Sequence, residues 1–185
     1  MPVRRRKMEK KVIIISGSAR KGGNSDLLCD EFLKGAAEAG NEVEKIRLAE
    51  KKIAGCIGCM ACKKNDGVCV FKDDLPGIVE KVIDADVMVM ASPVYYYAVN
   101  SQTKAFIDRT FARLPDIRDK EVYFILTCTD DEHAVNEALH DLRSFVHFLP
   151  GAVEKGVVYG TGNREKGAVI GKPVMQEAYE MGKTI

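Results

Sequence analysis

A buried strand that leads through a glycine-rich loop into a helix is the feature that most constrains this fold. Residues 12–15 are a continuous run of valine and isoleucine, which is typical of a strand covered on both faces in a parallel sheet. Residues 16–25 are rich in glycine and serine, and apolar residues then recur at helical spacing from Leu28 to Ala39, before Gly40. The loop is therefore expected to join a strand to a helix N-terminus.

The same alternation continues along the rest of the chain. Further strands are predicted at residues 43–48, 86–91, 121–127 and 153–159. Amphipathic helices are predicted after Asp73 and Asp74, over residues 99–114 and 131–149, and from Pro173 onward. Strands that alternate with helices predict an α/β fold, a doubly wound five-stranded parallel sheet with helices on both faces.

The bulk composition predicts one soluble domain, residues 1–185. Apolar residues make up 46% of the chain and charged residues 30%, as in ordinary globular proteins. The net charge of +1 gives no electrostatic case for nucleic acid, and no apolar run approaches the roughly twenty residues that cross a membrane. Six cysteines without a signal-like segment indicate a cytoplasmic protein. The basic run within residues 1–11 is expected to be a solvated, partly disordered terminus.

The loop at residues 16–25 predicts an anion site, because free N–H groups and the positive end of a helix dipole meet there. It is not a nucleotide P-loop, since Gly22 is followed by Gly23 and Asn24 rather than by lysine and a hydroxyl residue. The spacing of Gly17 and Gly22 does not fit the dinucleotide fingerprint either. A single phosphate, such as that of flavin mononucleotide (FMN), is the ligand we expect. The alternative is a solvated loop with an ordinary helix cap at Asn24 or Ser25.

A second informative loop follows the predicted strand at residues 86–91. Its sequence, Ser92-Pro93-Val94-Tyr95-Tyr96-Tyr97, offers backbone amides and aromatic faces to a flat ring such as isoalloxazine, although packing in the core or at an interface is an alternative. If the strand order is 2-1-3-4-5, this loop faces the phosphate loop across the crevice. Thr127, Cys128 and Thr129 reach the same edge of the sheet, and Cys128 is either a redox partner or a packed side chain.

Four cysteines gather in a loop at about residues 55–70. Cys56, Cys59 and Cys62 are spaced by two residues, and Cys69 follows after six more. This compact spacing favours a [4Fe-4S] cluster, with one cysteine for each iron. A structural zinc site, which normally uses two separated Cys-x-x-Cys pairs, is an alternative, as are disulfides and empty reduced thiols.

Taken together, the motifs resemble the iron-sulfur flavoprotein branch of the NADPH-dependent FMN reductase superfamily. They are Gly17–Ser25, the four cysteines, Asp73-Asp74, and Ser92–Tyr96 followed by Lys104–Arg109. The resemblance covers the chain from about Lys11 and implies a flavodoxin-like fold with strand order 2-1-3-4-5, noncovalent FMN, and a homodimer or homotetramer. It implies that FMN is bound by Ser18, Arg20, Lys21, Asn24 and Ser25, by Pro93, Val94, Tyr95 and Tyr96, and by Thr127 and Thr129. The cluster ligands would be Cys56, Cys59, Cys62 and Cys69.

These features predict a cytoplasmic FMN-dependent electron-transfer oxidoreductase that pairs a flavin with a [4Fe-4S] cluster and needs no catalytic acid or base. An NAD(P)H-dependent FMN or quinone reductase without a cluster is the alternative. A flavin- or zinc-binding protein with a sensing or scaffolding role and no turnover is a third. The expected redox partners are NAD(P)H, a quinone or a ferredoxin-like carrier.

Overall fold

The structure is a computed structural model that describes residues 9–185, so most of the basic run predicted to be disordered, residues 1–8, lies outside the described residues. The strands are β1 (Lys11–Ser16), β2 (Glu42–Arg47), β3 (Val87–Tyr95), β4 (Ala98–Val99), β5 (Glu121–Thr127) and β6 (Val153–Gly160). The α-helices are α1 (Asn24–Glu38), α2 (Leu75–Asp84), α3 (Ser101–Thr110), α4 (Glu132–His147) and α5 (Pro173–Lys183). Short 3-10 helices are η1 (Leu48–Glu50), η2 (Ala61–Lys63) and η3 (Leu114–Asp116).

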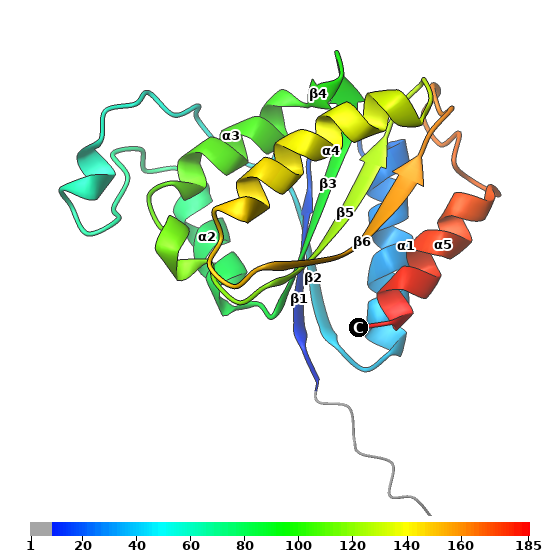
Figure 1. Ribbon diagram of the computed structural model, residues 1–185, viewed down its shortest axis with the longest axis horizontal. Helices are drawn as coiled ribbons and strands as arrows, with labels where there is room; N and C mark the ends of the chain where they lie inside the picture. Colours follow the sequence, from blue (N-terminus) through cyan, green and yellow to red (C-terminus); the bar gives the residue numbers. More distant parts are fainter. Residues whose placement is uncertain (1–8) are drawn as a thin grey trace, which may run out of the picture.

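The central sheet has the order β2-β1-β3-β5-β6, and these five strands are parallel (Figure 1). With the short β4 set aside, this is the second, first, third, fourth and fifth strand along the chain. The predicted doubly wound, flavodoxin-like topology is therefore confirmed. β4 was not predicted, and it pairs antiparallel with the end of β3.

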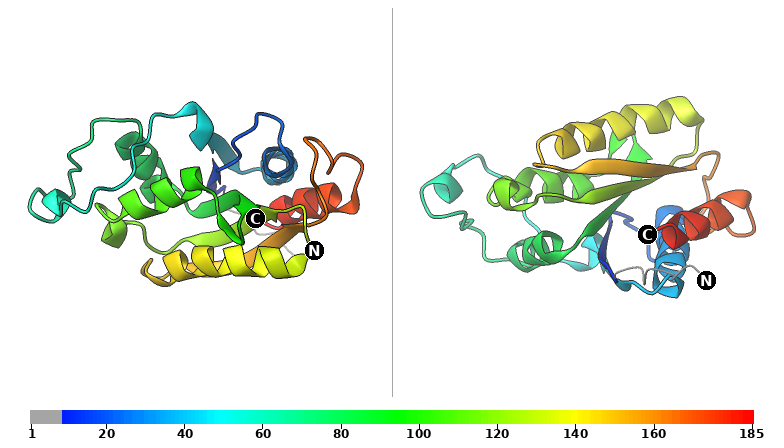
Figure 2. Two further views of the ribbon diagram at one scale, coloured as in Figure 1. Left: turned by 90° about the horizontal axis from the view of Figure 1, so that it is seen from above. Right: turned by 60° about the horizontal axis from the view of Figure 1, so that its bottom comes forward.

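Helices cover both faces of the sheet and create two apolar cores. α2, α3 and α4 pack on one face around buried side chains such as Phe106 and Leu139, and α1 and α5 pack on the other around Phe32. Figure 2 shows α4 and the α1–α5 pair on opposite sides of the sheet. The continuous apolar run of β1 follows from this arrangement, because each face of the strand is covered. No helix among the described residues is long and apolar enough to cross a bilayer.

Helices α1 and α5 touch through their backbones. A Cβ atom added at Gly35 would lie 2.0 Å from the carbonyl oxygen of Tyr179, and one added at Gly182 would lie 2.2 Å from that of Phe32. The two glycines therefore allow a close helix crossing that no larger residue would permit.

Two predicted boundaries and one predicted side-chain cap are wrong. β3 continues through Pro93 to Tyr95, where a loop was expected, because Ser92 and Pro93 pair with β5 and the last two residues pair with β4. α3 ends at Thr110 rather than at residue 114, and its last turn buries a charged residue, Arg109. The Asp74 side chain does not cap α2; it accepts a hydrogen bond from the Lys52 N–H at 2.7 Å instead.

Candidate functional site

Several loops leave the sheet at one edge, because the strands that carry them end at neighbouring register positions. Ser16, the last residue of β1, pairs with Ala91 in β3, and Pro93 in β3 pairs with Thr127 at the end of β5. Thr127 in turn pairs with Gly160 at the end of β6. The glycine-rich loop, the tyrosine segment and the Thr127 loop therefore start at the same carboxyl edge, where doubly wound folds bind ligands.

The glycine-rich loop forms an open cradle of backbone N–H groups, which we call the phosphate cradle (residues 17–25). Gly23 is the N-cap of α1, and no side chain accepts a hydrogen bond there. The alternative of an ordinary cap at Asn24 or Ser25 is therefore wrong, since both residues lie inside the helix. Within residues 9–185, the N–H groups of residues 18–21, 24 and 25 donate to no protein acceptor. These donors and the positive helix end can bind an anion.

Side chains shape this cradle from below and from its rim. Ser18 and Ser25 are buried, and the Ser18 hydroxyl donates to the carbonyl oxygen of Arg20 at 2.9 Å. A Cβ atom at Gly23 would lie 2.7 Å from the Ser18 Oγ, so glycine keeps the floor open. Arg20 and Lys21 are exposed at the rim, where their cations can attract an anion.

The loop after β6 forms a wall beside the phosphate cradle, although the sequence assigned no site residue to it. The Asn24 side-chain amide donates to the carbonyl oxygens of Asn163 at 3.1 Å and Glu165 at 2.9 Å. The Lys166 side chain also comes close to Gly22. The Asn24 Oδ1 atom is buried and accepts no hydrogen bond from the described residues, so a ligand donor would satisfy it.

Asp26 stabilises the cradle through buried hydrogen bonds and ion pairs. Its carboxylate accepts hydrogen bonds from the Gly22 N–H at 2.9 Å, from Lys45 at 3.0 Å and from Arg47 at 3.2 Å. Burial alone would raise the pKa of Asp26, but these donors outweigh burial and lower it. The sequence gives no signal for this network, because Lys45 and Arg47 come from β2.

Asn100 ties the tyrosine segment to the phosphate cradle, and sequence reasoning missed it. Its side-chain amide donates to the Gly17 carbonyl oxygen at 2.6 Å, and its Oδ1 accepts from the Thr103 N–H at 3.2 Å as the N-cap of α3. A Cβ atom at Gly17 would lie 2.0 Å from the Thr103 hydroxyl oxygen. Asparagine before a helix is a cap signal, but its second contact is not local in sequence.

The tyrosine segment is a tight hairpin between β3 and β4. Tyr95 pairs with Ala98, so Tyr96 and Tyr97 form a two-residue turn with φ values of 53° and 62°. Both values lie in the left-handed region, which normally selects glycine or asparagine in such turns. Tyr96 is 100% exposed, and the Tyr97 ring lies 5.6 Å from the ring of His133. The alternative that these tyrosines are core residues is therefore wrong.

The residues of the Thr127 loop differ in their burial. Thr127 is buried at the end of β5, whereas Thr129 is exposed. Between them the Cys128 thiol is buried and donates toward the carbonyl oxygens of Asp130 at 3.2 Å and Asp131 at 3.4 Å. Burial raises the pKa of Cys128, which favours the packed role over the redox one.

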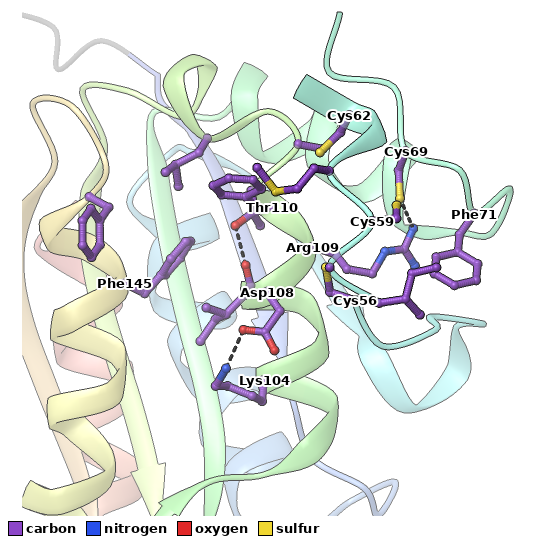
Figure 3. A pocket seen from close by; sticks show the side chains of 18 of the residues that line it. Cys56, Cys59, Cys62, Cys69, Phe71, Lys104, Asp108, Arg109, Thr110 and Phe145 are labelled. Carbon is purple, nitrogen blue, oxygen red and sulfur yellow. Dashed lines mark hydrogen bonds and ion pairs between the residues drawn. The ribbon is translucent and has the colours of Figure 1, made fainter. Parts of the chain in front are cut away.

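The four motif cysteines lie on a long segment, the cysteine loop (residues 55–72), which projects from the sheet edge (Figure 1). Cys56, Cys59, Cys62 and Cys69 all line one cavity of about 720 Å³ between this loop and helices α3 and α4 (Figure 3). The opposite wall carries the apolar side chains Ile107, Phe111 and Phe145 together with charged ones such as Lys104 and Asp108. All six cysteines of the chain are free thiols, so the disulfide alternative is not what this structure contains.

The neck of the cysteine loop is closed by hydrogen bonds. Asp74 N–H donates to the Lys52 carbonyl oxygen at 3.1 Å, and Ala54 N–H donates to the Asp73 carboxylate at 3.0 Å. Arg109 from α3 pairs with the same Asp73 carboxylate and donates to the Cys69 sulfur at 3.4 Å. The sequence predicted Asp73 as a helix cap and as part of the family motifs, and its carboxylate does accept from the Leu75 N–H at 3.3 Å.

Comparison with known proteins places these features in a family. Residues 10–165 match the family described as NADPH-dependent FMN reductase. The chain belongs to the NADPH-dependent FMN reductase family. An iron-sulfur flavoprotein of Methanocaldococcus jannaschii is 36% identical over 139 residues, which are 73% of this chain and 70% of that protein. The resemblance found in the sequence is thus confirmed.

Other relatives of this FMN reductase family member are similar over a shorter stretch or at lower sequence identity. A second iron-sulfur flavoprotein of M. jannaschii is 46% identical over 100 residues, 54% of this chain and 51% of that protein. A putative NAD(P)H-dependent FMN-containing oxidoreductase of Bacillus subtilis is 27% identical over 83% of this chain and 86% of its own length. The chain spans about half the length of several iron-sulfur flavoproteins that it matches.

Solved structures share the fold at low sequence identity. An azoreductase from Bacillus anthracis has a TM-score of 0.74 at 17% identity and covers 95% of this chain and 100% of its own. An NAD(P)H:quinone oxidoreductase from Methanothermobacter marburgensis has a TM-score of 0.74 at 12% identity and covers 96% of both chains. These likenesses confirm the flavodoxin-like fold alone.

The residues present can be compared with the needs of FMN, which the family description names, and of an iron-sulfur cluster, which the names of several relatives give. For FMN, the phosphate cradle offers unpaired N–H donors, and the Asn24 Oδ1 atom is an unpaired acceptor suited to a ribityl hydroxyl. For a cluster, four thiols face one cavity, and the buried Arg109 Nε atom beside it has no acceptor among the described residues. No three histidine, cysteine or acidic side chains in residues 9–185 gather around a point suited to one metal ion. A cubane cluster instead attaches each cysteine to a different iron.

Proposed function

We propose that this chain is an FMN-dependent electron-transfer oxidoreductase, and that it pairs the flavin with a [4Fe-4S] cluster. The observation that carries the flavin part is the phosphate cradle, whose free N–H groups open at the same sheet edge as the tyrosine hairpin. The observation that carries the cluster part is the set of four cysteines around one cavity. Relatives named iron-sulfur flavoproteins support both parts.

The residues proposed to bind FMN have distinct tasks. In the phosphate cradle, Ser18, Arg20, Lys21, Asn24 and Ser25 would bind the phosphate and the ribityl chain; at the hairpin, Pro93, Val94, Tyr95 and Tyr96 would hold the ring, with Thr127 and Thr129 near its edge. When bound, FMN supplies one- and two-electron redox chemistry. The side chains named here bind and orient, and the exposed faces of Tyr95 and Tyr96 are available to cover an aromatic ring.

The residues proposed to hold the cluster are Cys56, Cys59, Cys62 and Cys69. When bound, a [4Fe-4S] cluster supplies one-electron transfer. Left-handed backbone at Gly58 and Met60, with φ values of 66° and 58°, wraps the chain between the first three cysteines. The apolar side chains on the wall formed by α3 and α4 would keep water from that side of the group.

Anaerobic purification followed by iron and acid-labile sulfide assays tests this function. We expect a yellow-brown protein with about one cluster and one FMN per chain, and loss of the iron but not the FMN when Cys59 is changed to serine. Purified protein that holds FMN, lacks iron even after anaerobic reconstitution and has full reductase activity would contradict the cluster part. Protein that binds no FMN would contradict the whole proposal.

A second candidate is an NAD(P)H-dependent FMN or quinone reductase that works without a cluster. The B. subtilis relative favours it, since that protein is named for NAD(P)H and FMN alone and aligns with most of this chain. This reading predicts unchanged turnover when all four motif cysteines are replaced by serine. Steady-state rates with NADH or NADPH and a quinone would distinguish the two functions.

We further propose a cytoplasmic homodimer or homotetramer with NAD(P)H, a quinone or a ferredoxin-like carrier as redox partner. Free thiols support a reducing compartment. The cysteine loop exposes Ile57, Met60, Val68 and Val70, and exposed apolar side chains of this kind favour association of subunits. Sedimentation equilibrium of the native protein measures the assembly, and a monomer would contradict it.

A further inference from the structure

We propose that Arg109 is a positioning residue that closes the neck of the cysteine loop and orients Cys69, and that its cation eases reduction of a cluster held there. The first part concerns the protein alone. The second part rests on the cluster of the proposed function. Arg109 is absent from the set of ligand residues expected from the sequence, and it reaches the loop from helix α3.

The burial of Arg109 is the first observation. Its side chain is 1% exposed, although it carries a permanent charge in the last turn of α3. A buried charge is strongly unfavourable unless it is paired and hydrogen-bonded. The fold therefore gains something specific from placing a guanidinium here.

The contacts of Arg109 explain its burial, because they reach residues just before and just after the cysteine loop. Nη1 donates to the Ala54 carbonyl oxygen at 3.2 Å, two residues before the first motif cysteine, and pairs with the Asp73 carboxylate just after the loop. Nη2 donates to the sulfur of Cys69 at 3.4 Å, as drawn in Figure 3, and the guanidinium lies 5.0 Å from the centre of the Phe71 ring. One side chain thus fixes both ends of the loop and the last cysteine.

The unpaired Nε atom is the second observation. It is one of two buried side-chain polar atoms in the described part of the chain without a partner, and Arg109 lines the cavity that the four cysteines share. An ion pair that served only to stabilise α3 would need neither the sulfur contact nor a spare donor at this wall. An anionic group among the cysteines would supply the missing acceptor.

The cation also has a direct electrostatic consequence for such a group. Hydrogen bonds to the sulfurs and nearby positive charge both raise the reduction potential of an iron-sulfur cluster. Arg109 offers both, because it donates to one ligand sulfur and keeps its charge at every accessible pH. Removing it should therefore make the cluster harder to reduce.

Limited trypsin digestion of the cluster-free protein tests the neck. Lys63 and Lys64 lie exposed within the cysteine loop and are cleavable when the loop opens. We expect Arg109→Met to raise the cleavage rate at these sites roughly tenfold or more, since a charged hydrogen bond is lost and digestion follows the open population. Arg143→Met is the matched control, because Arg143 pairs with Glu154 on the surface at 2.7 Å and should leave the rate unchanged.

Arg109→Lys is the second variant, in case loss of a buried cation unfolds the chain. Lysine keeps the charge near Asp73 but lacks the fork that reaches Ala54 and Cys69 together, so faster loop cleavage is again expected with FMN binding retained. Wild-type cleavage rates in Arg109→Lys and in any folded Arg109→Met would overturn the positioning role.

The second readout is the midpoint potential of the reconstituted cluster, followed by electron paramagnetic resonance in a redox titration. We expect a lower potential in Arg109→Met, or in the equally uncharged Arg109→Gln if the former does not fold, and the wild-type value in Arg143→Met. An unchanged potential in the Arg109 variant would overturn the electrostatic part. If the wild-type protein takes up no iron, the proposed cluster fails, whereas the digestion still decides whether Arg109 closes the loop.

Discussion

Asp26 shows how a single buried carboxylate can stabilise a ligand loop. It is 2% exposed, and Lys45 and Arg47 neutralise its charge while the Gly22 N–H holds it in place. Without Asp26, the loop with its unpaired N–H groups would lie beside the buried cations of Lys45 and Arg47, and the folded protein would be less stable before any ligand bound. The carboxylate therefore belongs to the folding of the cradle rather than to anion binding itself, which its negative charge would oppose.

We predict that Asp26→Asn lowers the free energy of unfolding by about 3 kcal/mol at pH 7, because Lys45 and Arg47 lose the buried carboxylate that they share and keep only the exposed carboxylates of Asp30 and Glu50. The folded state lowers the pKa of Asp26, so its contribution is present above the ordinary carboxyl pKa of about 4 and is lost as pH falls through the lower folded value. Urea unfolding of both proteins between pH 7 and pH 3 measures this. The difference in the free energy of unfolding between wild type and Asp26→Asn should become smaller as the pH falls.

A matched control is Asp30→Asn, because Asp30 pairs with the same Lys45 but has a side chain that is 51% exposed. Its loss should change stability by less than about 1 kcal/mol. A difference between wild type and Asp26→Asn that stays constant across the acid range would refute the electrostatic explanation.

Tyr97 has a strained, left-handed backbone conformation, which the sequence does not predict because the residue is neither glycine nor asparagine. We predict that Tyr97→Gly raises the free energy of unfolding by about 1 kcal/mol, because the left-handed conformation at φ 62° is unfavourable for a side chain with a Cβ atom. Loss of the ring contact with His133 offsets part of this gain, and His133→Ala measures that part separately. Thermal unfolding of FMN-free protein is the assay, and a less stable Tyr97→Gly than His133→Ala would disprove the strain.

At the scale of elements, local pattern was enough for the strands and most helices. The run at residues 12–15 could only be a covered strand, and Asp131 was correctly predicted to open α4, where its side chain accepts from the His133 N–H at 3.0 Å. The hairpin at Tyr96 was missed because its turn lacks the glycine or asparagine that marks such turns. Arg109 was named within the Lys104–Arg109 motif, but its buried contacts were missed because a charge at a helix end normally faces water.

The candidate site was predictable where its residues are neighbours in sequence. The phosphate cradle and the spacing of the cysteines are local, and both were found. Contacts between distant segments were not: Asn100 with Gly17, Asn24 with the loop after β6, and Arg109 with Cys69 depend on the packing of elements that no short motif encodes.

The close crossing of α1 and α5 predicts the effect of a substitution at Gly35, and Gly77 in α2 provides the comparison. Gly35→Ala should lower the free energy of unfolding by about 3 kcal/mol, because the new Cβ would lie 2.0 Å from a backbone oxygen of α5 and force the helices apart. Gly77→Ala in α2 meets nothing within 4 Å and should raise it by about 0.5–1 kcal/mol. Denaturant unfolding of the two variants should move in opposite directions, and equal effects would contradict a backbone contact at Gly35.

At the scale of the whole molecule, the sheet brings separate segments together at one edge and leaves the cysteine loop projecting beside them. Folding of the sheet therefore builds the cradle before any ligand binds, whereas the cysteine loop depends on its neck and on α3 for its shape. Ligand effects on global stability should accordingly report on the cradle.

The last prediction uses this coupling. At a free FMN concentration of 100 times its dissociation constant, binding should raise the free energy of unfolding by about 2.7 kcal/mol. Riboflavin at the same concentration should give a smaller gain, because it lacks the phosphate that we propose the cradle binds. In Gly23→Ala, a Cβ atom 2.7 Å from the Ser18 hydroxyl oxygen would fill the floor, so the FMN gain should fall to the riboflavin level.

Gly77→Ala serves as the control, since it adds the same methyl group far from the cradle and should keep the full difference between the two ligands. Thermal shift measurements with both flavins on all three proteins give the comparison directly. Equal stabilisation of the wild type by FMN and riboflavin would mean that the phosphate is not bound here, whatever the ring contacts. Retention of the FMN advantage in Gly23→Ala would instead place the phosphate outside residues 17–25, because a filled floor is incompatible with an anion held by the first turn of α1.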